Sequence, residues 1–400
     1  MGKKKNKRVT ANNKKSKAKK IEPTSLEDMS SSLHANFVSD AGPGCYIARR
    51  DSPNPPSWLI EWEDVDPEEF RGEDDEETAE VPDVAIDTDE QTLSLCNVDT
   101  CYKVAYVTVY DIEVVGADGI SLTPGSTTDN QGTSSSCITF IVLVPPCVFV
   151  HLCYLVIPAE VDDITSLRIE SDVSPWQQHP NPNDEHTLRI GFPLGKVPAS
   201  ADIVKASPSS SALPSYLCTQ GEGGELTHFF SGNLHAIDFQ CPVGTELLAV
   251  ADGIVIDVKY DNTLTGIAVT NLYEWNSIIL QICKQKDRND SLPASDDSHV
   301  DNILEHSDGP LFVEYVHIQT SLVQKGDTVK KGQIIGYSGS VGFSPEPHLH
   351  FSAFRSSDPK APTVRVLFDA TFAETKDPSD PTTPFLPVAG MWYTAKGAVG

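Results

Sequence analysis

Residues 346–351 have the sequence Glu346-Pro347-His348-Leu349-His350-Phe351. The two histidines are two positions apart and have apolar neighbours, a pattern that predicts a strand with both imidazole rings on one face. Such a pair suits a metal site, because one ring can bind the ion while its neighbour exchanges a proton. Two solvated histidines on a strand would have the same pattern, so the segments upstream must distinguish the two interpretations.

Charge is distributed unevenly along the chain. Its 400 residues leave room for two or three domains, and its formal net charge of −27 argues against nucleic-acid binding by the body of the protein. Residues 1–20 nevertheless carry ten Lys or Arg and no acid, whereas residues 73–77 are EDDEE. The basic tail is typical of a nuclear or nucleolar address, of an arm that touches RNA or anionic lipid, or of a plain solvated tail. We expect no specific nucleic-acid binding beyond a weak contribution of this tail.

The start of the chain lacks the apolar stretch of a signal peptide, so we expect an intracellular, cytoplasmic protein, with the nucleus as the alternative. The nine cysteines form no CxxC pair and no zinc-finger spacing. Their odd number and the missing leader predict reduced, mostly buried thiols, with a Cys96–Cys101 bridge as the alternative in an exported chain. The oligomeric state does not follow from the sequence.

Composition divides the chain into parts of different character. The N-terminal part has charge blocks and little periodicity, which predicts disorder, and β-branched and aromatic runs such as residues 103–115 then predict a small domain of β-sandwich type. A linker rich in Ser, Pro and Ala separates it from a second region of short strands with Gly-led turns. The expected parts are a disordered segment at 1–91, the sandwich-like domain at 92–205, the linker at 206–214, the second domain at 215–387 and a tail at 388–400.

Residues 137–157, CITFIVLVPPCVFVHLCYLVI, contain no formal charge and are long enough to span a bilayer. The pair Pro145-Pro146 at the centre, the β-branched residues and His151 favour two buried strands joined at the prolines. We therefore expect no membrane association and keep a membrane segment as the alternative.

Four segments of the second region together resemble the lysostaphin-type zinc endopeptidases, also called the LytM family. Their order and spacing match that family over about a third of the chain. They are QGEGGELTH (220–228) with HAIDF (235–239), PVGT (242–245) through ADGIV (251–255), VEYVH (313–317) with LVQKGDTVKKGQIIGYSG (322–339), and GFS (342–344) through HLHF (348–351).

The resemblance implies a β-barrel or antiparallel-sheet peptidase domain, the duplicated hybrid motif fold, with one Zn²⁺ per chain. A His, an Asp and the second His of HxH would hold the ion, and Asp238 and His350 match the last two. A water would be the fourth ligand, and three protein ligands with one open position are typical of catalytic zinc. His317 and His348 match the family's two further histidines, which by resemblance accept and donate protons and stabilise the tetrahedral intermediate.

The remaining ligand is either His228 or His235. His235 lies three residues before Asp238, so in an unbroken strand the two side chains would point to opposite faces. The pair Thr227-His228 follows a Gln-Gly-rich start and resembles a longer-loop version of the family. We favour His228 and keep His235 as the alternative, or as a residue near the substrate.

The resemblance implies endopeptidase action on short peptide bridges, glycine-rich or of peptidoglycan type. The alternative is a peptide- or glycan-binding or regulatory module of the same fold without catalysis, but the presence of every ligand and both further histidines favours an enzyme. Residues 323–336 also resemble biotinyl- and lipoyl-carrier domains. They lack a modifiable Lys at a hairpin tip with its characteristic neighbours, so they support only the β-architecture.

Four residues near these segments are expected to be structural rather than functional. His306 and Asp252 precede or occupy Gly-containing turns, and Cys218 and Cys241 have the size and polarity of small core residues.

Overall fold

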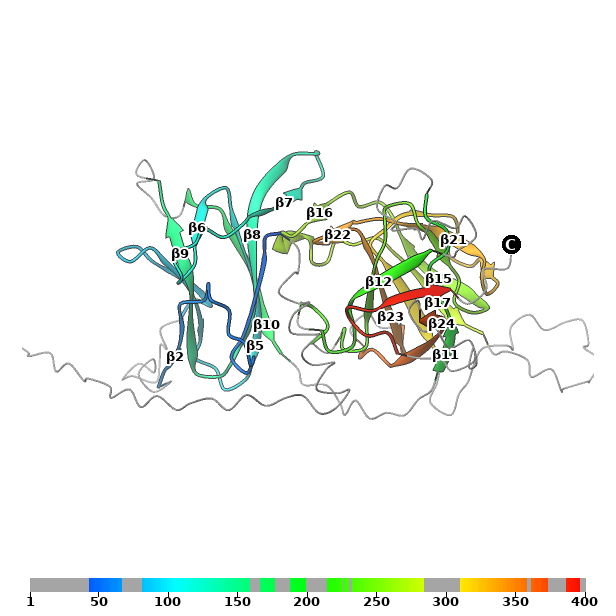
Figure 1. The fold of residues 1–400 in the computed structure, drawn as a ribbon, viewed down its shortest axis with the longest axis horizontal. Coiled ribbons are helices and arrows are strands. Elements are labelled where there is room, and N and C mark those ends of the chain that lie inside the picture. Colours follow the sequence, from blue (N-terminus) through cyan, green and yellow to red (C-terminus); the bar gives the residue numbers. More distant parts are fainter. Residues whose placement is uncertain are drawn as a thin grey trace, which may run out of the picture.

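A computed structural model of the chain describes residues 43–66, 81–158, 166–176, 188–198, 214–224, 226–229, 232–283, 310–357, 361–372 and 386–395. The disorder predicted for residues 1–42 and 67–80 lies outside these residues. Within the described ranges the regular structure is nearly all strand, with the short 3-10 helix η3 (Val269–Asn271), so the prediction of a mainly β protein is confirmed. The strands form two bodies side by side (Figure 1), which we call the sandwich domain (within 43–176) and the C-terminal domain (within 188–395).

The sandwich domain consists of two sheets that face each other across an apolar core. One sheet contains β1 (Cys45–Arg49), β5 (Lys103–Tyr110), β7 (Gly125–Thr128), β8 (Ser134–Val144) and β10 (Ile169–Pro175). The other contains β2 (Glu61–Asp64), β3 (Val84–Asp87), β4 (Thr92–Asn97), β6 (Glu113–Val115) and β9 (Val148–Val156). Leu95, Val107, Phe140 and Leu152 are among the side chains that fill the space between them.

The uncharged stretch 137–157 forms buried strands, as predicted. It supplies β8 and β9, which lie in opposite sheets and are joined at Pro145-Pro146. Both faces of β8 are covered, because Phe140 lies in the sandwich core while Ile141 packs against the C-terminal domain. A strand buried on both faces reads as a continuous apolar run, which accounts for the missing charges. Among the described residues no helix is long and apolar enough to cross a membrane.

The prediction of disorder for the whole of 1–91 is wrong where the structure describes that segment. Strands β1, β2 and β3 lie within it, and β1 runs parallel to β8. Trp58 anchors the segment, because its ring lies 5.3 Å from that of Phe140 and 5.7 Å from that of Tyr46. A few apolar side chains are sufficient here, since β8, β9 and β4 already provide the sheets to which β1, β2 and β3 add.

The C-terminal domain is built on a ten-stranded sheet and a three-stranded sheet around one core. The large sheet has the order β11 (Leu188–Gly191), β24 (Val366–Phe372), β25 (Trp392–Ala395), β12 (Ser215–Gln220), β13 (Ile237–Gln240), β23 (His348–Phe354), β18 (Phe312–Val316), β17 (Ser277–Ile282), β15 (Gly253–Lys259) and β20 (Thr328–Val329). The small sheet has the order β14 (Glu246–Leu248), β21 (Ile334–Ser338) and β19 (Ile318–Ser321). Aromatic side chains such as Phe239, Tyr315 and Phe351 are completely buried between them.

Two predicted domain boundaries differ from the structure. Strand β11, expected in the sandwich-like domain, pairs in parallel with β24 of the C-terminal domain, where the ring of Phe192 lies 5.1 Å from that of Phe239. Strand β25, expected in the tail, pairs with β12 and buries Tyr393. In both cases the strand pairs with a segment distant in sequence. Local composition does not reveal such a pairing. The predicted linker at 206–214 lies outside the described residues except for Pro214.

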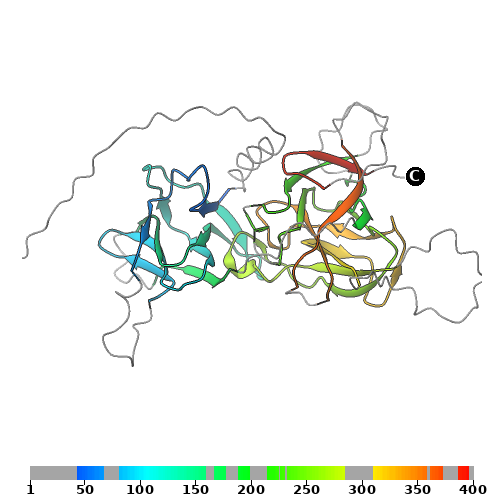
Figure 2. The same cartoon turned by 90° about the horizontal axis from the view of Figure 1, so that it is seen from below.

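The two domains are joined by strands (Figures 1 and 2). Side chains add further contacts between them. Strand β16 (Thr265–Gly266) pairs with β7 of the sandwich domain and with β22 (Gly342–Phe343), so one sheet continues from one domain into the other. Gly266 has φ +112°, and a Cβ there would lie 2.2 Å from the carbonyl oxygen of Ser126, so only glycine fits. Thr139 adds a buried hydrogen bond from its hydroxyl to the carbonyl of Ile267, at 2.5 Å.

Candidate metal centre

The centre of the large sheet determines where the predicted residues lie. Strands β13 and β23 are antiparallel, with Asp238 opposite His350 and Gln240 opposite His348. Residues directly opposite each other share a face of the sheet, and His348 shares that face with His350 through the two-residue repeat. The EPHLHF stretch is therefore a strand with both rings on one side, as its sequence predicts.

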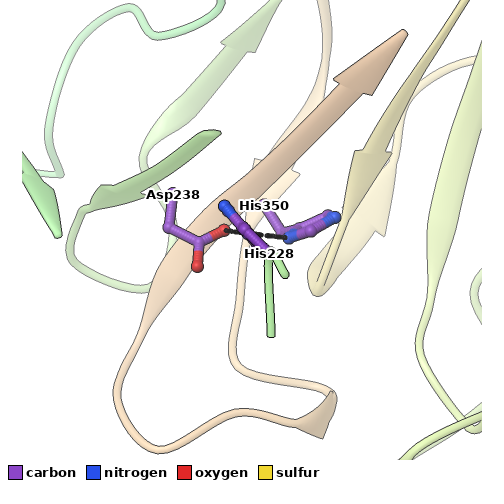
Figure 3. A group of neighbouring side chains, drawn as sticks. All are labelled: His228, Asp238 and His350. Carbon is purple, nitrogen blue, oxygen red and sulfur yellow. Dashed lines mark hydrogen bonds and ion pairs between the residues drawn. The ribbon is translucent and has the colours of Figure 1, made fainter. Parts of the chain in front are cut away.

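Three predicted residues meet in a buried cluster, His228, Asp238 and His350, whose ligand atoms all lie within 4.8 Å of one another (Figure 3). The Nδ1 atom of His350 lies 2.9 Å from Oδ1 of Asp238, and Nε2 of His228 lies 3.3 Å from both of these atoms. His228 is completely buried and the other two side chains nearly so. We call these three residues the candidate centre.

The loop between β12 and β13 holds His228. The Nδ1–H of His228 donates to the carbonyl of Gly221 at 2.9 Å, and Nε2 faces the cluster. Gln220 supports this loop, because its side-chain oxygen accepts from the backbone N–H of Thr227 at 2.8 Å. The side-chain amide of Gln220 also donates to Oδ2 of Asp238 at 2.7 Å, so the same residue orients both the loop and the carboxylate.

The charge states of the cluster suit a divalent cation. Burial alone would raise the pKa of Asp238, but the neighbouring His228, His348 and His350 hold that pKa well below its usual range. Burial lowers the pKa of His350. At neutral pH the cluster therefore offers an ionised carboxylate and a neutral imidazole at His350, the forms in which these groups bind metal. Two imidazole nitrogens and one carboxylate oxygen fit a zinc ion with an open fourth position. His228 and Asp238 are each held by a further hydrogen bond, from His228 to Gly221 and from Gln220 to Asp238.

His317 and His348 lie beside the cluster, and their rings are 4.5 Å apart. Each ring is fixed through Nδ1–H, which donates to the carbonyl of Val341 in His317 (2.6 Å) and to that of Glu346 in His348 (2.7 Å). The Nε2 atom of each ring is then the one that can accept a proton, and Nε2 of His348 lies 3.9 Å from Oδ1 of Asp238. Burial holds the pKa of His317 well below its usual value.

The backbone of His317 is in the left-handed region, with φ +64°. His317 stands between β18 of the large sheet and β19 of the small sheet, where the chain changes from one sheet to the other. A residue other than glycine in this conformation is strained, and such strain concentrates at functional sites because the surroundings must hold it.

His235 does not belong to the cluster, which among the described residues contains His228 instead. The Nδ1 atom of His235 lies 3.2 Å from Oε2 of Glu222, and Arg365 donates to the same carboxylate with its Nε at 2.6 Å and also with its second guanidinium nitrogen. Strand β13 begins only at Ile237, so His235 lies in the turn before the strand and the argument from an unbroken strand does not account for its placement.

The residues expected to be structural are found in structural settings. Cys218 and Cys241 are buried in the core of the C-terminal domain, and Asp252 accepts from the backbone N–H of Lys331 at 2.8 Å in a turn. All nine cysteines are free thiols, six of them buried, as predicted. His306 lies outside the described residues.

A cavity of about 270 Å³ opens beside the cluster. Asp238, His317, His348 and His350 lie in its wall, so the candidate centre is accessible from it. The wall also includes residues of the sandwich domain, which the sequence did not indicate. Gln220 was likewise missed as a site residue, although it stands at the start of the first family segment.

Comparison with known proteins agrees with this geometry. Residues 298–362, which contain His317, His348 and His350, match the family described as Peptidase family M23. The chain is 31% identical to the glycyl-glycine endopeptidase ALE-1 of Staphylococcus capitis over 156 residues, 39% of this chain and 34% of that protein. These matches confirm the predicted resemblance of the C-terminal domain to the lysostaphin-type M23 peptidases.

Two further matches are to lysostaphin. Lysostaphin of Staphylococcus staphylolyticus is 30% identical over 128 residues, 32% of this chain and 20% of that protein. The solved catalytic domain of lysostaphin from Staphylococcus simulans is 23% identical, with 43% of this chain and 85% of that chain covered and a TM-score of 0.22. The chain spans about a third or less of the length of the curated relatives it matches.

Proposed function

We propose that this chain is a zinc-dependent metalloendopeptidase that hydrolyses peptide bonds with a zinc-activated water. One observation carries the proposal, namely that His228, Asp238 and His350 come together from separate segments with His317 and His348 beside them. A buried set of three potential ligands at the edge of a cavity is typical of catalytic sites and not of structural zinc, which has four protein ligands.

His228, Asp238 and His350 would hold one Zn²⁺, through Nε2, a carboxylate oxygen and Nδ1 respectively. When bound, the ion lowers the pKa of a water toward neutrality and polarises the scissile carbonyl. The hydrogen bonds from Gln220 to Asp238 and from His228 to Gly221 fix the orientation of the ligands before the ion binds.

His317 and His348 would move the protons. Burial keeps His317 neutral, so its Nε2 can accept a proton from the attacking water. The Nε2 atom of His348 lies 3.9 Å from Oδ1 of Asp238; once protonated, it would donate a hydrogen bond to the oxygen of the scissile carbonyl and stabilise the developing negative charge. Transfer of the accepted proton to the leaving amine then completes hydrolysis.

For the substrate we propose glycine-rich peptides or peptide bridges of peptidoglycan type. The support is the similarity to a protein named glycyl-glycine endopeptidase and the small volume of the cavity, which suits an unbranched chain.

A non-catalytic peptide- or glycan-binding module of the same fold is the second candidate. It is favoured by the sandwich domain, whose strands β5 and β10 contribute to the wall of the cavity and so restrict access to the centre.

Cleavage of pentaglycine by the full chain, followed by mass spectrometry, separates the two candidates. The enzyme proposal predicts hydrolysis that falls about 10²- to 10⁴-fold in His317→Ala and His348→Ala, while both variants still bind zinc. The exposed Gln319 offers a matched control, and Gln319→Ala should retain full activity. Binding of pentaglycine without hydrolysis by the zinc-loaded wild type would contradict the enzyme proposal and favour the binding module.

A further inference from the structure

We propose that the sandwich domain forms part of the substrate-binding site: the Tyr106 hydroxyl binds a backbone carbonyl of the peptide, and the Asp172 carboxylate binds a primary ammonium group. This inference rests on the proposed peptidase function and deepens it, because it names the chemical feature of the substrate that this chain selects.

The alternation of β5 brings Tyr106 to the site. Ala105 and Val107 point into the core of the sandwich, whereas Val104 and Tyr106 point to the other face, which packs against the C-terminal domain. Strand β10 pairs with β5 so that Asp172 lies opposite Tyr106. The two side chains therefore share the face that is turned toward the candidate centre.

A single cavity connects these side chains to the centre. Its wall includes Tyr106 and Asp172 of the sandwich domain and, from the C-terminal domain, Asp238, His317 and His350. A peptide bound with its scissile bond at the centre would thus extend along both domains.

The Tyr106 hydroxyl lacks a hydrogen-bond partner among the residues that the structure describes. The side chain is only 4% exposed, and its ring is held edge-on against Phe343 with the centroids 6.0 Å apart. A buried hydroxyl without a hydrogen-bond partner costs free energy. We therefore infer that a ligand supplies the acceptor. The acceptor that a peptide offers at every residue is its backbone carbonyl.

The charge of the cavity selects a cation. Asp172 and Glu314 lie in its wall, and none of the described residues that line it is Lys or Arg. Of these two carboxyl groups, Glu314 already has hydrogen bonds with Trp275 and Ser277, and burial raises its pKa. Asp172 is therefore the group that we assign to the cation. Asp172 is half-buried and accepts a hydrogen bond from Tyr273, so it keeps lone pairs for a further donor.

Aromatic rings complete the environment for an ammonium group. Tyr273 and Trp275 line the cavity with their ring centroids 6.3 Å apart, and ring faces attract cations. A peptide offers a primary ammonium from two sources, its N-terminal amine and an amino side chain, and Asp172 would bind either.

Calorimetric titration of the zinc-loaded full chain with three probes tests the inference. The probes are tetraglycine, N-acetyl-tetraglycine and N-acetyl-Gly-Lys-Gly-Gly, and the His317→Ala background prevents their consumption. At least one probe with an amine should bind about tenfold more tightly than N-acetyl-tetraglycine, and the better of the two identifies the source of the ammonium. Asp172→Asn should abolish this preference, whereas the exposed control Asp89→Asn should keep it.

Tyr106→Phe should weaken the binding of all three probes by a similar factor, because every probe has backbone carbonyls. The matched control is Tyr154→Phe on the exposed side of β9. Zinc content and the unfolding transition of each variant show that the site is intact.

Equal binding of acetylated and free peptides, or a preference that survives Asp172→Asn, would overturn the assignment of Asp172. Unchanged binding in Tyr106→Phe would overturn that of Tyr106. Failure of this inference is distinguishable from failure of the proposed function. Hydrolysis of acetylated and free peptides at equal rates by the wild type refutes the inference alone, and selective binding without hydrolysis refutes the peptidase alone.

Discussion

Gln220 connects the two halves of the candidate centre at the scale of single residues. It accepts from the backbone of Thr227 in the His228 loop and donates to Asp238, so one side chain fixes both the loop and the carboxylate. Residues that orient metal ligands in this way contribute to affinity although they do not touch the ion.

Gln220→Ala should lower zinc affinity about 10- to 100-fold, because the carboxylate of Asp238 and the His228 loop lose their common support. Competition with a fluorescent zinc chelator measures this affinity. The exposed Gln319→Ala should bind zinc like the wild type. Wild-type affinity in Gln220→Ala would contradict the role assigned to this residue.

Spacing predicted part of the candidate site. The HxH repeat places His348 and His350 on one face, and the pairing with β13 then brings Asp238 opposite His350. The choice between His228 and His235 required the structure, because it depends on the path of the turn before Ile237 and not on residue type. The structure brings His228, Asp238 and His350 together, and their role as ligands stays a prediction.

A cluster of His235, Glu222 and Arg365 connects the His228 loop to the edge of β24 at the scale of elements. Glu222 lies one residue after Gly221, whose carbonyl accepts from His228, and Arg365 directly precedes β24. The carboxylate between them therefore ties the loop of the candidate centre to the sheet.

The pH dependence of stability should report this cluster. Burial alone would raise the pKa of Glu222, but hydrogen bonds from His235 and Arg365 lower it from 4.5 to about 2. A carboxyl whose pKa is lower in the folded state stabilises that state above its unfolded pKa, and this contribution disappears as the pH falls through the folded pKa. The free energy of unfolding should therefore fall between about pH 4.5 and pH 2 more steeply in the wild type than in Glu222→Gln.

Urea denaturation at a series of pH values measures this difference. Glu90→Gln is the control, since Glu90 is exposed in the turn before β4, and it should leave the slope unchanged. Parallel curves for the wild type and Glu222→Gln in this pH range would contradict the assignment.

At the scale of the whole molecule, buried hydrogen bonds connect the sandwich domain to the C-terminal domain. Thr139 and Thr108 bond to each other in the sandwich domain, and they also bond to the backbone of Ile267 and Val269 from the C-terminal domain. These buried polar contacts lie beside an apolar interface that contains residues of both domains.

Thr139→Val should cost about 1–3 kcal/mol of stability, because it leaves buried polar partners of the hydroxyl unsatisfied. Thermal unfolding followed by calorimetry should show the loss in the transition of both domains. The exposed control Thr88→Val should have little effect. A loss confined to the sandwich domain would contradict the coupling through this interface.

The mainly β class was predictable from strand-like runs and Gly-led turns, and the continuous apolar run of β8 indicated deep burial. The covered second face of β8 could not be predicted, because it depends on contacts with residues more than a hundred positions away. The strand pairing that joins the two domains could not be predicted either, because β16 and β22 are two residues long and have no periodicity. Strands β1 to β3 were missed because their stability comes from the sheets that they join.

Zinc content per chain, measured by elemental analysis of the purified protein, tests the central claim most directly. The wild type should contain about one zinc, Asp238→Ala and His350→Ala should lose it, and so should His228→Ala but not His235→Ala. Loss in His235→Ala with retention in His228→Ala would contradict the assigned centre, and a wild type that binds no zinc even after reconstitution would contradict the metallopeptidase itself.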